Sequence, residues 1–300
     1  MKILLTGAFK YTDEQIEYLK SQGHQLVFHK NEFEKIPFDV SDIDGVICNA
    51  LFLNNPIKSF KSLKLIQLTS AGYDRVPVDY IKENSIKLFN ARGVYSAPMA
   101  EFAVCGVLQL YKQSSYFYEN KKKHLWEKHR GLLELCGKRV LIVGCGSIGS
   151  ETAKRFKAFD TEIIGIDLCP KENEYFDMVY PLNHLDHCLG EADIVVLSLP
   201  LTEENQHFFD DSKFQLMKPS ALLVNISRGR LVNEASLISA LEHNIIGGAV
   251  LDVFEEEPLA ENSSLWDMEN VILTPHNSFV GENNNVRMFD IIKNNLRNFV

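Results

Sequence analysis

The sequence predicts an α/β protein built on parallel sheets and divided into two domains. Short apolar, β-branched segments alternate with segments whose apolar residues recur at helical spacing, a pattern typical of parallel sheets with helices on both faces. A glycine-rich turn joins one such strand to one such helix at residues 144–149. The length of 300 residues, with 45% apolar side chains, suffices for about two domains with sizeable cores.

Residues 1–97 are expected to form the first domain. Thr12, followed by Asp13 and Gln15, is typical of a helix start. Between the helical stretches, the sequence predicts short strands at Ile3–Leu5, Gln25–Phe28, Gly45–Cys48, Lys64–Leu68 and Lys87–Phe89.

Two turns directly follow predicted strands of this domain, Thr69–Asp74 and Asn90–Gly93. Their small residues leave backbone N–H groups accessible to a ligand, and open α/β sheets bind ligands at the carboxyl ends of strands. For either turn taken alone, an ordinary glycine-containing turn is the simpler interpretation.

Residues 98–278 are expected to form the second domain. Pro98 is well placed to start a long helix, Pro98–Tyr118, that connects the domains. Trp126, in the charged segment after it, is interpreted as packed in the core or at a subunit interface. A further helix is predicted at Asn233–His243. The strands are predicted at Val140–Val143, Glu162–Ile166, Ile194–Leu199, Ala221–Ile226, Gly248–Val253 and Val271–Leu273.

The last stretch, Glu282–Val300, is predicted to be a helix that packs back on the first domain. Residues 279–300 are therefore assigned to that domain, together with residues 1–97.

The turn G-x-G-x-x-G at Gly144, Gly146 and Gly149 carries the most specific signal in the chain. The first glycine permits a tight turn, the second a close approach of a pyrophosphate, and the third close packing of helix on strand. Asp167, at the end of the next strand, is suited to both ribose hydroxyls, and its charge favours NAD over NADP. The motif alone is weak evidence for dinucleotide binding. Here the strand, turn, helix, second strand and acid all occur in the expected order, which predicts a dinucleotide-binding site.

Three predicted strand ends carry ionisable side chains suited to carbonyl chemistry: Arg228, Glu257 and His276. Arginine can polarise a carbonyl and hold a carboxylate through paired hydrogen bonds. Histidine can deliver a proton near neutrality, and a carboxylate beside it orients the ring and favours its charged form. Taken singly, each has an ordinary interpretation, as a surface arginine, a member of a solvated acidic run, or a loop histidine.

Composition excludes several classes of function. The net charge of −9 argues against a nucleic-acid or anionic-membrane partner. No apolar span is long enough to cross a membrane, and the N-terminus is too weakly apolar for a signal peptide, so a cytoplasmic location is expected. The cysteines are scattered without metal-ligand spacing, which indicates no metal site and free, mostly buried thiols in a reducing compartment.

Several segments resemble the signature blocks of the D-isomer-specific 2-hydroxyacid dehydrogenase family: LIVGCGSIGSETAKRFKAFD, LSLPLTEENQHFF, VNISRGRLVNEASLISAL, GGAVLDVFEEEP and LWDMENVILTPH. The resemblance covers nearly the whole chain. It implies two Rossmann-like domains, a flavodoxin-like substrate domain and a doubly wound NAD-binding domain, with a cleft between them. It also implies hydride transfer between NAD(H) and C2 of a small 2-oxo or D-2-hydroxy acid, usually by a homodimer.

The resemblance assigns roles to the strand-end residues. Arg228 matches the arginine that binds the substrate carboxylate and carbonyl, and His276 matches the proton donor. Glu257 matches the glutamate that partners the histidine, and it separates this chain from the similar formate dehydrogenases, which carry glutamine there. Asp252 matches an aspartate near the nicotinamide carboxamide.

The resemblance also implies that the backbone amides of Ser70, Ala71 and Gly72 hold the substrate carboxylate, together with Arg228 and His276. The residues expected to bind the cofactor are Gly144, Gly146, Ser147, Ile148, Gly149, Asp167, Pro200, Thr202, Ser227 and Asp252.

Two departures from the family pattern stand out. Asn205 replaces a threonine common after Pro-Leu-Thr, a change expected to matter little. Residues 277–279 are bulkier and more polar than usual, which indicates an unusual substrate pocket.

Alternatives remain open at this stage. An NAD(H)-sensing binding protein of the corepressor type on the same fold is the rival function. The candidate substrates are glyoxylate, hydroxypyruvate, longer aliphatic 2-oxo acids and 3-phosphoglycerate. Arg75 and Arg92 are candidate phosphate contacts, although each is equally plausible as a surface charge.

Overall fold

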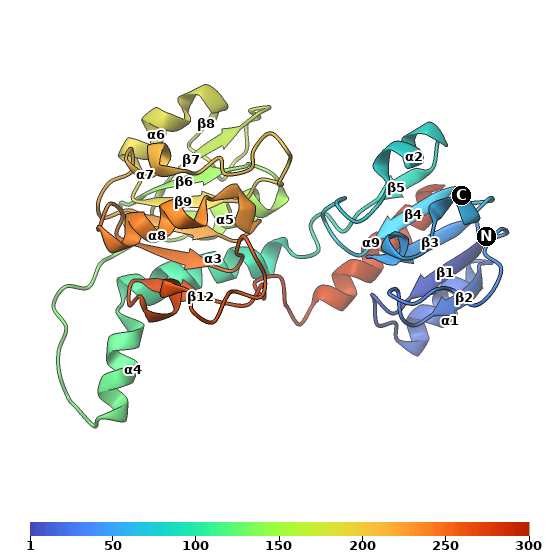
Figure 1. Cartoon of the computed structure of the whole chain (residues 1–300), viewed down its shortest axis with the longest axis horizontal. Coiled ribbons are helices and arrows are strands. Elements are labelled where there is room, and N and C mark those ends of the chain that lie inside the picture. Colours follow the sequence, from blue (N-terminus) through green and yellow to red (C-terminus); the bar gives the residue numbers. More distant parts are fainter. Residues whose placement is uncertain (300) are drawn as a thin grey trace. The chain divides into compact units, whose positions relative to one another are not determined.

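The computed structural model describes residues 1–299 and divides the chain into two compact units (Figure 1). Unit 1 comprises Met1–Tyr95 and the described residues from Gly281 onward, and unit 2 comprises Ser96–Val280. Each unit contains one sheet in which all paired strands are parallel, which confirms the predicted fold class.

The sheet of unit 1 has five strands in the order β2-β1-β3-β4-β5. Each predicted strand of the first domain is present, and its ends differ from the prediction by one residue at most. The strands are β1 (Lys2–Thr6), β2 (Gln25–His29), β3 (Gly45–Cys48), β4 (Leu65–Leu68) and β5 (Lys87–Phe89).

Helices α1 (Asp13–Ser21) and α9 (Asn284–Phe299) cover one face of this sheet, and α2 (Val78–Glu83) lies on the other with the short helices η1 (Leu51–Leu53) and η2 (Ile57–Ser59). The C-terminal helix therefore lies in unit 1; Val300, the last residue of the predicted helix, lies outside the described residues. The predicted helix start at Thr12 is confirmed, and Thr12 caps α1 in a reciprocal capping box with Gln15.

The sheet of unit 2 has seven strands in the order β12-β11-β10-β9-β6-β7-β8. The strands are β6 (Arg139–Val143), β7 (Glu162–Asp167), β8 (Met178–Pro181), β9 (Ile194–Leu197), β10 (Leu222–Asn225), β11 (Gly248–Leu251) and β12 (Val271–Leu273). The sequence did not predict β8. This strand lies at the edge of the sheet, where little burial is required, so it lacks the apolar pattern of the inner strands.

Side chains alternate between the two faces of this sheet. Val140 and Ile142 of β6 pack with α3 (Ser96–Tyr111) and α5 (Ser147–Lys157). Leu141 and Val143 pack on the opposite side. That side is covered by α6 (Leu185–Glu191), α7 (Asp211–Phe214) and α8 (Glu234–Glu242). The remaining short helices are η3 (Leu182–His184), η4 (Gly229–Leu231) and η5 (Ser264–Asp267). The sheet is thus buried on both faces, and ligands can reach it only at its edges.

The prediction of one helix at Pro98–Tyr118 is wrong. Two helices occur, α3 and α4 (Ser114–Lys122), and α3 belongs to unit 2. Gln113 breaks the helix in a left-handed conformation with φ of 52°. The local sequence Lys-Gln-Ser-Ser explains the break, because serine favours helix starts over helix interiors.

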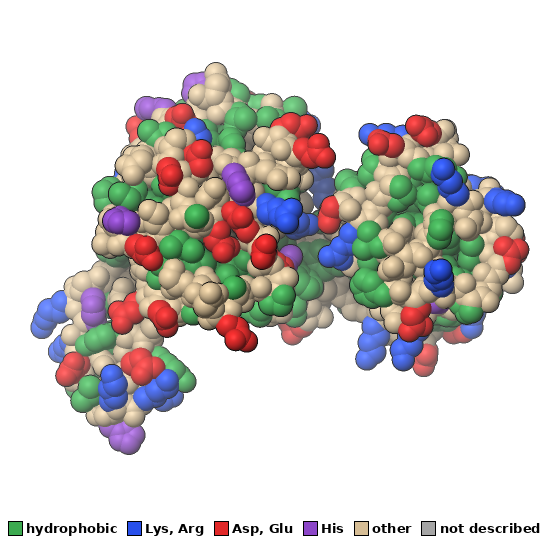
Figure 2. Space-filling model, viewed as in Figure 1, with side chains coloured by type: hydrophobic (Ala, Val, Ile, Leu, Met, Phe, Trp, Pro, Cys, Tyr) green, Lys and Arg blue, Asp and Glu red, His purple; other side chains and the backbone are tan. Residues whose placement is uncertain are grey.

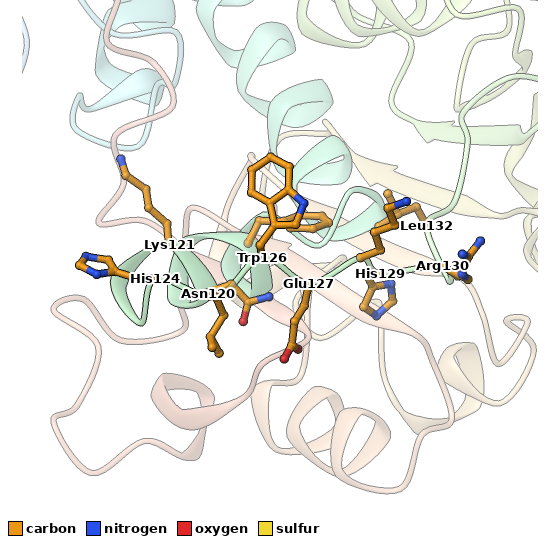
Figure 3. A pocket seen from close by; sticks show the side chains of 11 residues that line it. Asn120, Lys121, His124, Trp126, Glu127, His129, Arg130 and Leu132 are labelled. Atoms are coloured by element: carbon orange, nitrogen blue, oxygen red, sulfur yellow. The ribbon is translucent and has the colours of Figure 1, made fainter.

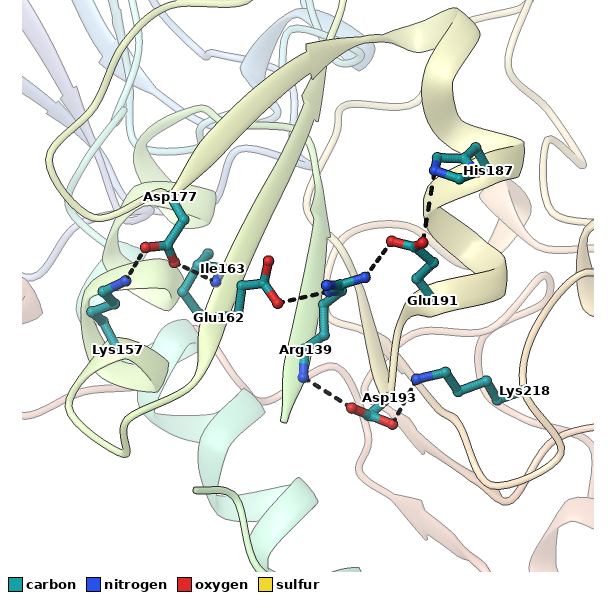
Figure 4. Close-up of polar contacts among 9 residues, drawn as sticks. All are labelled: Arg139, Lys157, Glu162, Ile163, Asp177, His187, Glu191, Asp193 and Lys218. Atoms are coloured by element: carbon teal, nitrogen blue, oxygen red, sulfur yellow. Dashed lines mark hydrogen bonds and ion pairs between the residues drawn. The ribbon is translucent and has the colours of Figure 1, made fainter. Parts of the chain in front are cut away.

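The amino ends of the strands in unit 2 are joined by charged side chains (Figure 4). Arg139 at the start of β6 pairs with Glu162 at the start of β7 (Nε–Oε2 2.8 Å) and also with Glu191. Asp193, just before β9, accepts hydrogen bonds from the backbone N–H of Arg139 at 2.9 Å and from the Lys218 ammonium at 3.0 Å. These contacts occupy the edge opposite to the strand ends that carry the predicted site.

In the described part of the chain, every helix is too short or too polar to span a lipid bilayer.

We expect Asp193→Ala to lower the free energy of unfolding of unit 2 at pH 7 by about 1–3 kcal/mol, because it leaves a half-buried N–H without its charged acceptor. Burial alone would raise the pKa of Asp193, but the Arg139 N–H and the Lys218 ammonium outweigh it and lower that pKa. The stabilisation is therefore complete above about pH 4 and is lost as the pH falls further. Urea unfolding at several pH values measures it.

Asp186→Ala is the matched control, since Asp186 is an exposed partner of Lys213 in the same unit. It should cost less than about 1 kcal/mol. If the two variants lost equal free energy of unfolding, the stabilising role of Asp193 as acceptor of the Arg139 backbone N–H would be contradicted.

Candidate active site

The glycine turn between β6 and α5 has the geometry that the motif predicts. Gly144 adopts φ of +101°, and a Cβ there would lie 2.8 Å from the backbone of Leu199. A Cβ on Gly149 would lie 2.1 Å from the Gly144 carbonyl oxygen. A Cβ on Gly146, in contrast, would meet no atom within 4 Å. The middle glycine therefore borders open space at the start of α5, with Ser147 and Ile148 beside it, and this arrangement fits a pyrophosphate.

Asp167 ends β7 with its carboxylate held by backbone N–H groups. Oδ2 accepts from Cys145 N at 2.8 Å, and Oδ1 accepts from Cys169 N at 2.9 Å. Each oxygen keeps a further acceptor site for a ribose hydroxyl, so the carboxylate is oriented without being saturated. Burial, followed by the nearby Asp167 charge, raises the pKa of the Cys145 thiol to about 12, which makes this cysteine a poor nucleophile.

Asn205 organises the turn after β9, although its departure from the family pattern was expected to matter little. Its side chain accepts from Thr202 N at 2.7 Å and donates to Pro200 O at 2.8 Å. Ser227, after β10, donates its hydroxyl to Leu199 O. Pro200, Thr202 and Ser227, which are predicted to contact the cofactor, are thus fixed by contacts with Asn205 and Leu199.

His276 and Glu257 lie together at the carboxyl edge of the same sheet. Their Nδ1 and Oε2 atoms are 2.8 Å apart, with side chains 43% and 37% exposed. Glu257 Oε1 also accepts from Phe254 N at 3.2 Å. One nitrogen of this partly exposed ring is therefore fixed by the carboxylate, and Nε2 is the nitrogen left to meet a ligand.

A buried carboxylate holds the turn that carries His276. Asp252, which is fully buried, accepts from the Thr274 hydroxyl at 2.6 Å, from Asn277 N at 2.7 Å and from Ser278 N at 2.9 Å. His276 itself adopts φ of 50°, an unfavourable conformation for a side-chain-bearing residue. The contacts of Asp252 stabilise that conformation. The sequence predicted a cofactor contact for Asp252, and that role stays a prediction.

Arg228 follows β10 at the same edge, half-buried, with Nη1 donating to Ser227 O at 2.9 Å. The next residue must be glycine, because a Cβ on Gly229 would lie 1.9 Å from the backbone of Phe254. This close approach brings the turn of Arg228 against the loop that carries Glu257.

That loop is also fixed to α8. Glu255 accepts from Glu234 N at 2.7 Å, and Glu234 accepts from Glu255 N at 3.2 Å. His207 lies 3.1 Å from the same Glu255 oxygen. Burial, together with the carboxylates of Glu255 and Glu256, raises the pKa of Glu234. The acidic run 255–257 is therefore not a uniformly solvated stretch, since its first and last members have separate partners.

A cavity of about 580 Å³ opens beside the His276–Glu257 pair. Apart from the pair and Thr274, its lining is apolar: Phe254, Pro258, Leu259, Trp266, Leu273 and Pro275. Such a lining suits an apolar group bound beside the pair.

The predicted carboxylate-binding turn lies in unit 1, directly after β4. Ser70 and Gly72 are partly buried and Ala71 is exposed. The hydroxyl of Ser70 donates to Gly72 O at 3.1 Å. Arg75 lies 4.0 Å from Asp74, and Arg92 is exposed.

Among residues 1–299, no three His, Cys, Asp or Glu side chains gather as a metal site would require. The cysteines are free, but the expectation that most are buried is wrong. Only Cys48 and Cys188 are buried, because Cys105, Cys136 and Cys169 lie outside the cores.

A dinucleotide turn and a histidine–carboxylate pair at one sheet edge define a class, the nicotinamide-dependent oxidoreductases. The family model for "D-isomer specific 2-hydroxyacid dehydrogenase, NAD binding domain" matches residues 104–278. A glyoxylate reductase from Korarchaeum cryptofilum is 32% identical over 267 residues, which are 86% of this chain and 80% of that protein. The chain therefore belongs to the D-isomer specific 2-hydroxyacid dehydrogenase family.

Solved structures agree with this assignment. A D-isomer specific 2-hydroxyacid dehydrogenase family protein from Aeromonas salmonicida has a TM-score of 0.81 and 30% identity, covering 99% of this chain and 94% of that one. An NADPH-dependent glyoxylate/hydroxypyruvate reductase from Sinorhizobium meliloti, in complex with NADP and sulfate, has a TM-score of 0.78 and 25% identity, with the same coverages.

We expect Asp252→Asn to lower kcat by about 10- to 100-fold, because an amide presents one acceptor oxygen to a cluster of three donors. The dissociation constant of NADH, measured by fluorescence, should change by less than about threefold. A loss of NADH affinity as large as the loss of kcat would instead favour the cofactor contact that the sequence predicted.

Asp267→Asn is the matched control, because Asp267 is an exposed aspartate of the same unit. Its kinetic constants should match those of the wild type.

Proposed function

We propose that this chain reduces small 2-oxo acids to D-2-hydroxy acids with NADH, and that His276 supplies the proton. The observation that carries the proposal is the 2.8 Å contact between His276 Nδ1 and Glu257 Oε2, which leaves Nε2 for the substrate. A histidine held in this way can act as an acid in reduction and as a base in oxidation.

The roles of the other residues follow from their chemistry. The bound dinucleotide supplies the hydride that reaches C2 of the substrate. The guanidinium of Arg228 binds the substrate carboxylate and polarises the ketone. The backbone amides of Ser70, Ala71 and Gly72 hold the same carboxylate. Glu257 stabilises the imidazolium of His276, so that a proton is available for the oxygen as negative charge develops there.

Asp167 supports NADH over NADPH. The carboxylate stands at the end of β7, fixed by two backbone N–H groups, where it would repel a 2′-phosphate. The Sinorhizobium meliloti reductase binds NADP, so similarity to it does not fix the choice between NADH and NADPH. That choice depends on the residues of each chain.

The substrates proposed first are glyoxylate and hydroxypyruvate, which are named for similar proteins. A phosphorylated substrate is less favoured, because Arg92 is exposed and Arg75 has an acidic neighbour in Asp74. The NAD(H)-sensing alternative is not favoured either, since the similar proteins carry the names of reductases.

A panel of 2-oxo acids, run with NADH and NADPH in parallel, tests the function. We expect turnover of glyoxylate or hydroxypyruvate, with kcat/KM at least about tenfold higher for NADH. Arg228→Ala should reduce kcat/KM by about 10³-fold while the protein stays folded, because it removes a charge-assisted pair of hydrogen bonds. Cofactor binding without turnover across the panel would contradict the enzyme, and a preference for NADPH would contradict the role of Asp167.

We also propose that the chain forms a homodimer through an arm, defined as α4 and residues 123–134. The arm stands away from the sheet of unit 2 (Figure 1), and hydrophobic side chains lie among charged ones on its surface (Figure 2). Trp126 is 97% exposed, so its interpretation as a core residue is wrong. Trp126 projects from the arm beside a hollow of about 900 Å³ (Figure 3). The other exposed large apolar residues of the arm are Phe117, Tyr118, Leu125, Leu132 and Leu133.

So many exposed apolar side chains on one projection are typical of an interface, and a second copy of the chain is the partner that the family resemblance implies. Trp126→Ala should weaken the dimer by about 30-fold, since buried tryptophans dominate interface energies. Light scattering across a dilution series measures this. Phe33→Ala, a change at an exposed aromatic residue of unit 1, should leave the dimer unchanged. A monomeric wild-type protein at micromolar concentration would contradict the proposal.

A further inference from the structure

The turn at residues 70–72 is held through its carbonyl oxygens. The side-chain Nδ2 of Asn90 donates to Ala71 O at 2.6 Å. The backbone N–H of Ala91 donates to Ser70 O at 2.9 Å. Both contacts come from the turn that follows β5, the strand next to β4 in the sheet. The turns that follow β4 and β5 thus form one hydrogen-bonded structure.

A third contact extends the same arrangement by one residue. The hydroxyl of Tyr95 donates to Thr69 O. Burial raises the pKa of Tyr95, which keeps its O–H protonated and available as a donor.

These contacts fix the direction of the N–H groups on the other side of the turn. In a trans peptide the C=O and N–H groups point in opposite directions, so anchoring the carbonyls of Thr69, Ser70 and Ala71 orients the N–H groups of residues 70–72 away from the anchors. A hydrogen bond to a peptide oxygen also strengthens the N–H of that peptide as a donor. Within the described residues, none of these N–H groups donates to another protein atom.

Asn90 is itself held from two sides. Its Oδ1 accepts from Arg92 N at 3.2 Å, which turns the amide nitrogen toward Ala71. Its carbonyl oxygen accepts from Nε2 of Gln67, a fully buried residue of β4, at 3.2 Å. Asn295 of α9 donates in turn to Gln67 Oε1 at 2.7 Å. A polar chain therefore runs from the C-terminal helix through the sheet to the turn.

We propose that Asn90 is a positioning residue for the carboxylate of the substrate, acting through the Ala71–Gly72 peptide. Without the amide of Asn90, this peptide can rotate, and the N–H of Gly72 no longer points with its neighbours toward one anion. The inference rests on the proposed function, because it takes residues 70–72 as the carboxylate site. Asn90 acts only through the turn and has no role in hydride or proton transfer.

The test is Asn90→Ala, assayed with the 2-oxo acid that the wild type turns over best. We expect KM to rise about tenfold, with kcat within about threefold and the NADH dissociation constant within about twofold of the wild type. The inhibition constant of oxamate, an unreactive analogue with the same carboxylate, should rise with KM. Asn84→Ala is the matched control, because Asn84 also donates to a backbone carbonyl, that of Tyr80, at the end of α2.

A merely structural role would lower the unfolding midpoint and kcat and leave the oxamate constant unchanged, and this result would overturn the proposal. If Asn90→Ala does not fold, Asn90→Leu decides, since it keeps the approximate size of the side chain, removes the donor to Ala71 O and should likewise raise KM about tenfold. If the wild type turns over no 2-oxo acid, the proposed function fails by itself. Oxamate binding to the NADH complex then decides the inference, which is overturned if the wild type and Asn90→Ala bind equally or not at all.

Discussion

The carboxylate of Asp252 is the contact on which the histidine pair depends. Within residues 1–299 it is buried and pairs with no cation, and its charge is compensated by one hydroxyl and two backbone N–H groups from the turn after β12. A buried charge requires such donors, so the turn cannot relax without leaving the carboxylate unsatisfied. The left-handed conformation of His276 is thereby fixed at a position where the sequence alone gives no reason for it. The ring then meets Glu257 from the neighbouring strand.

The two edges of the sheet in unit 2 serve different purposes. Charged side chains at the amino ends of β6, β7 and β9 neutralise one another, as Arg139 does with Glu162 and Glu191 (Figure 4). At the carboxyl ends, polar groups instead bind backbone atoms and leave capacity for a ligand, as Asp167 does. Parallel strands make this division possible, because all amino ends lie at one edge and all carboxyl ends at the other.

The sequence predicted those features that depend on local patterns. The glycine turn, the inner strands and the helix start at Thr12 each have a short-range signature, and the structure confirms them. The pairing of Glu257 with His276 could be expected from their strand ends and from the family resemblance. The prediction failed at Gln113 and at β8, where a single left-handed residue and an edge position outweighed the pattern. Contacts that join distant turns, such as those of Asn205 and Asn90, have no signature in a single sequence.

The place of α9 in unit 1 has a consequence for the order in which the chain folds. Met288, Ile292 and Leu296 complete one of the two apolar cores of that unit, alongside Ile3 and Leu5 of β1. A ribosome makes all of unit 2 before it reaches these residues, although β1 is made first. Unit 2 can therefore mature during synthesis as an uninterrupted segment, whereas the amino-terminal sheet waits, half covered, for a helix nearly three hundred residues away. This topology places the completion of the unit 1 core after the synthesis of unit 2, although the amino-terminal sheet is made first.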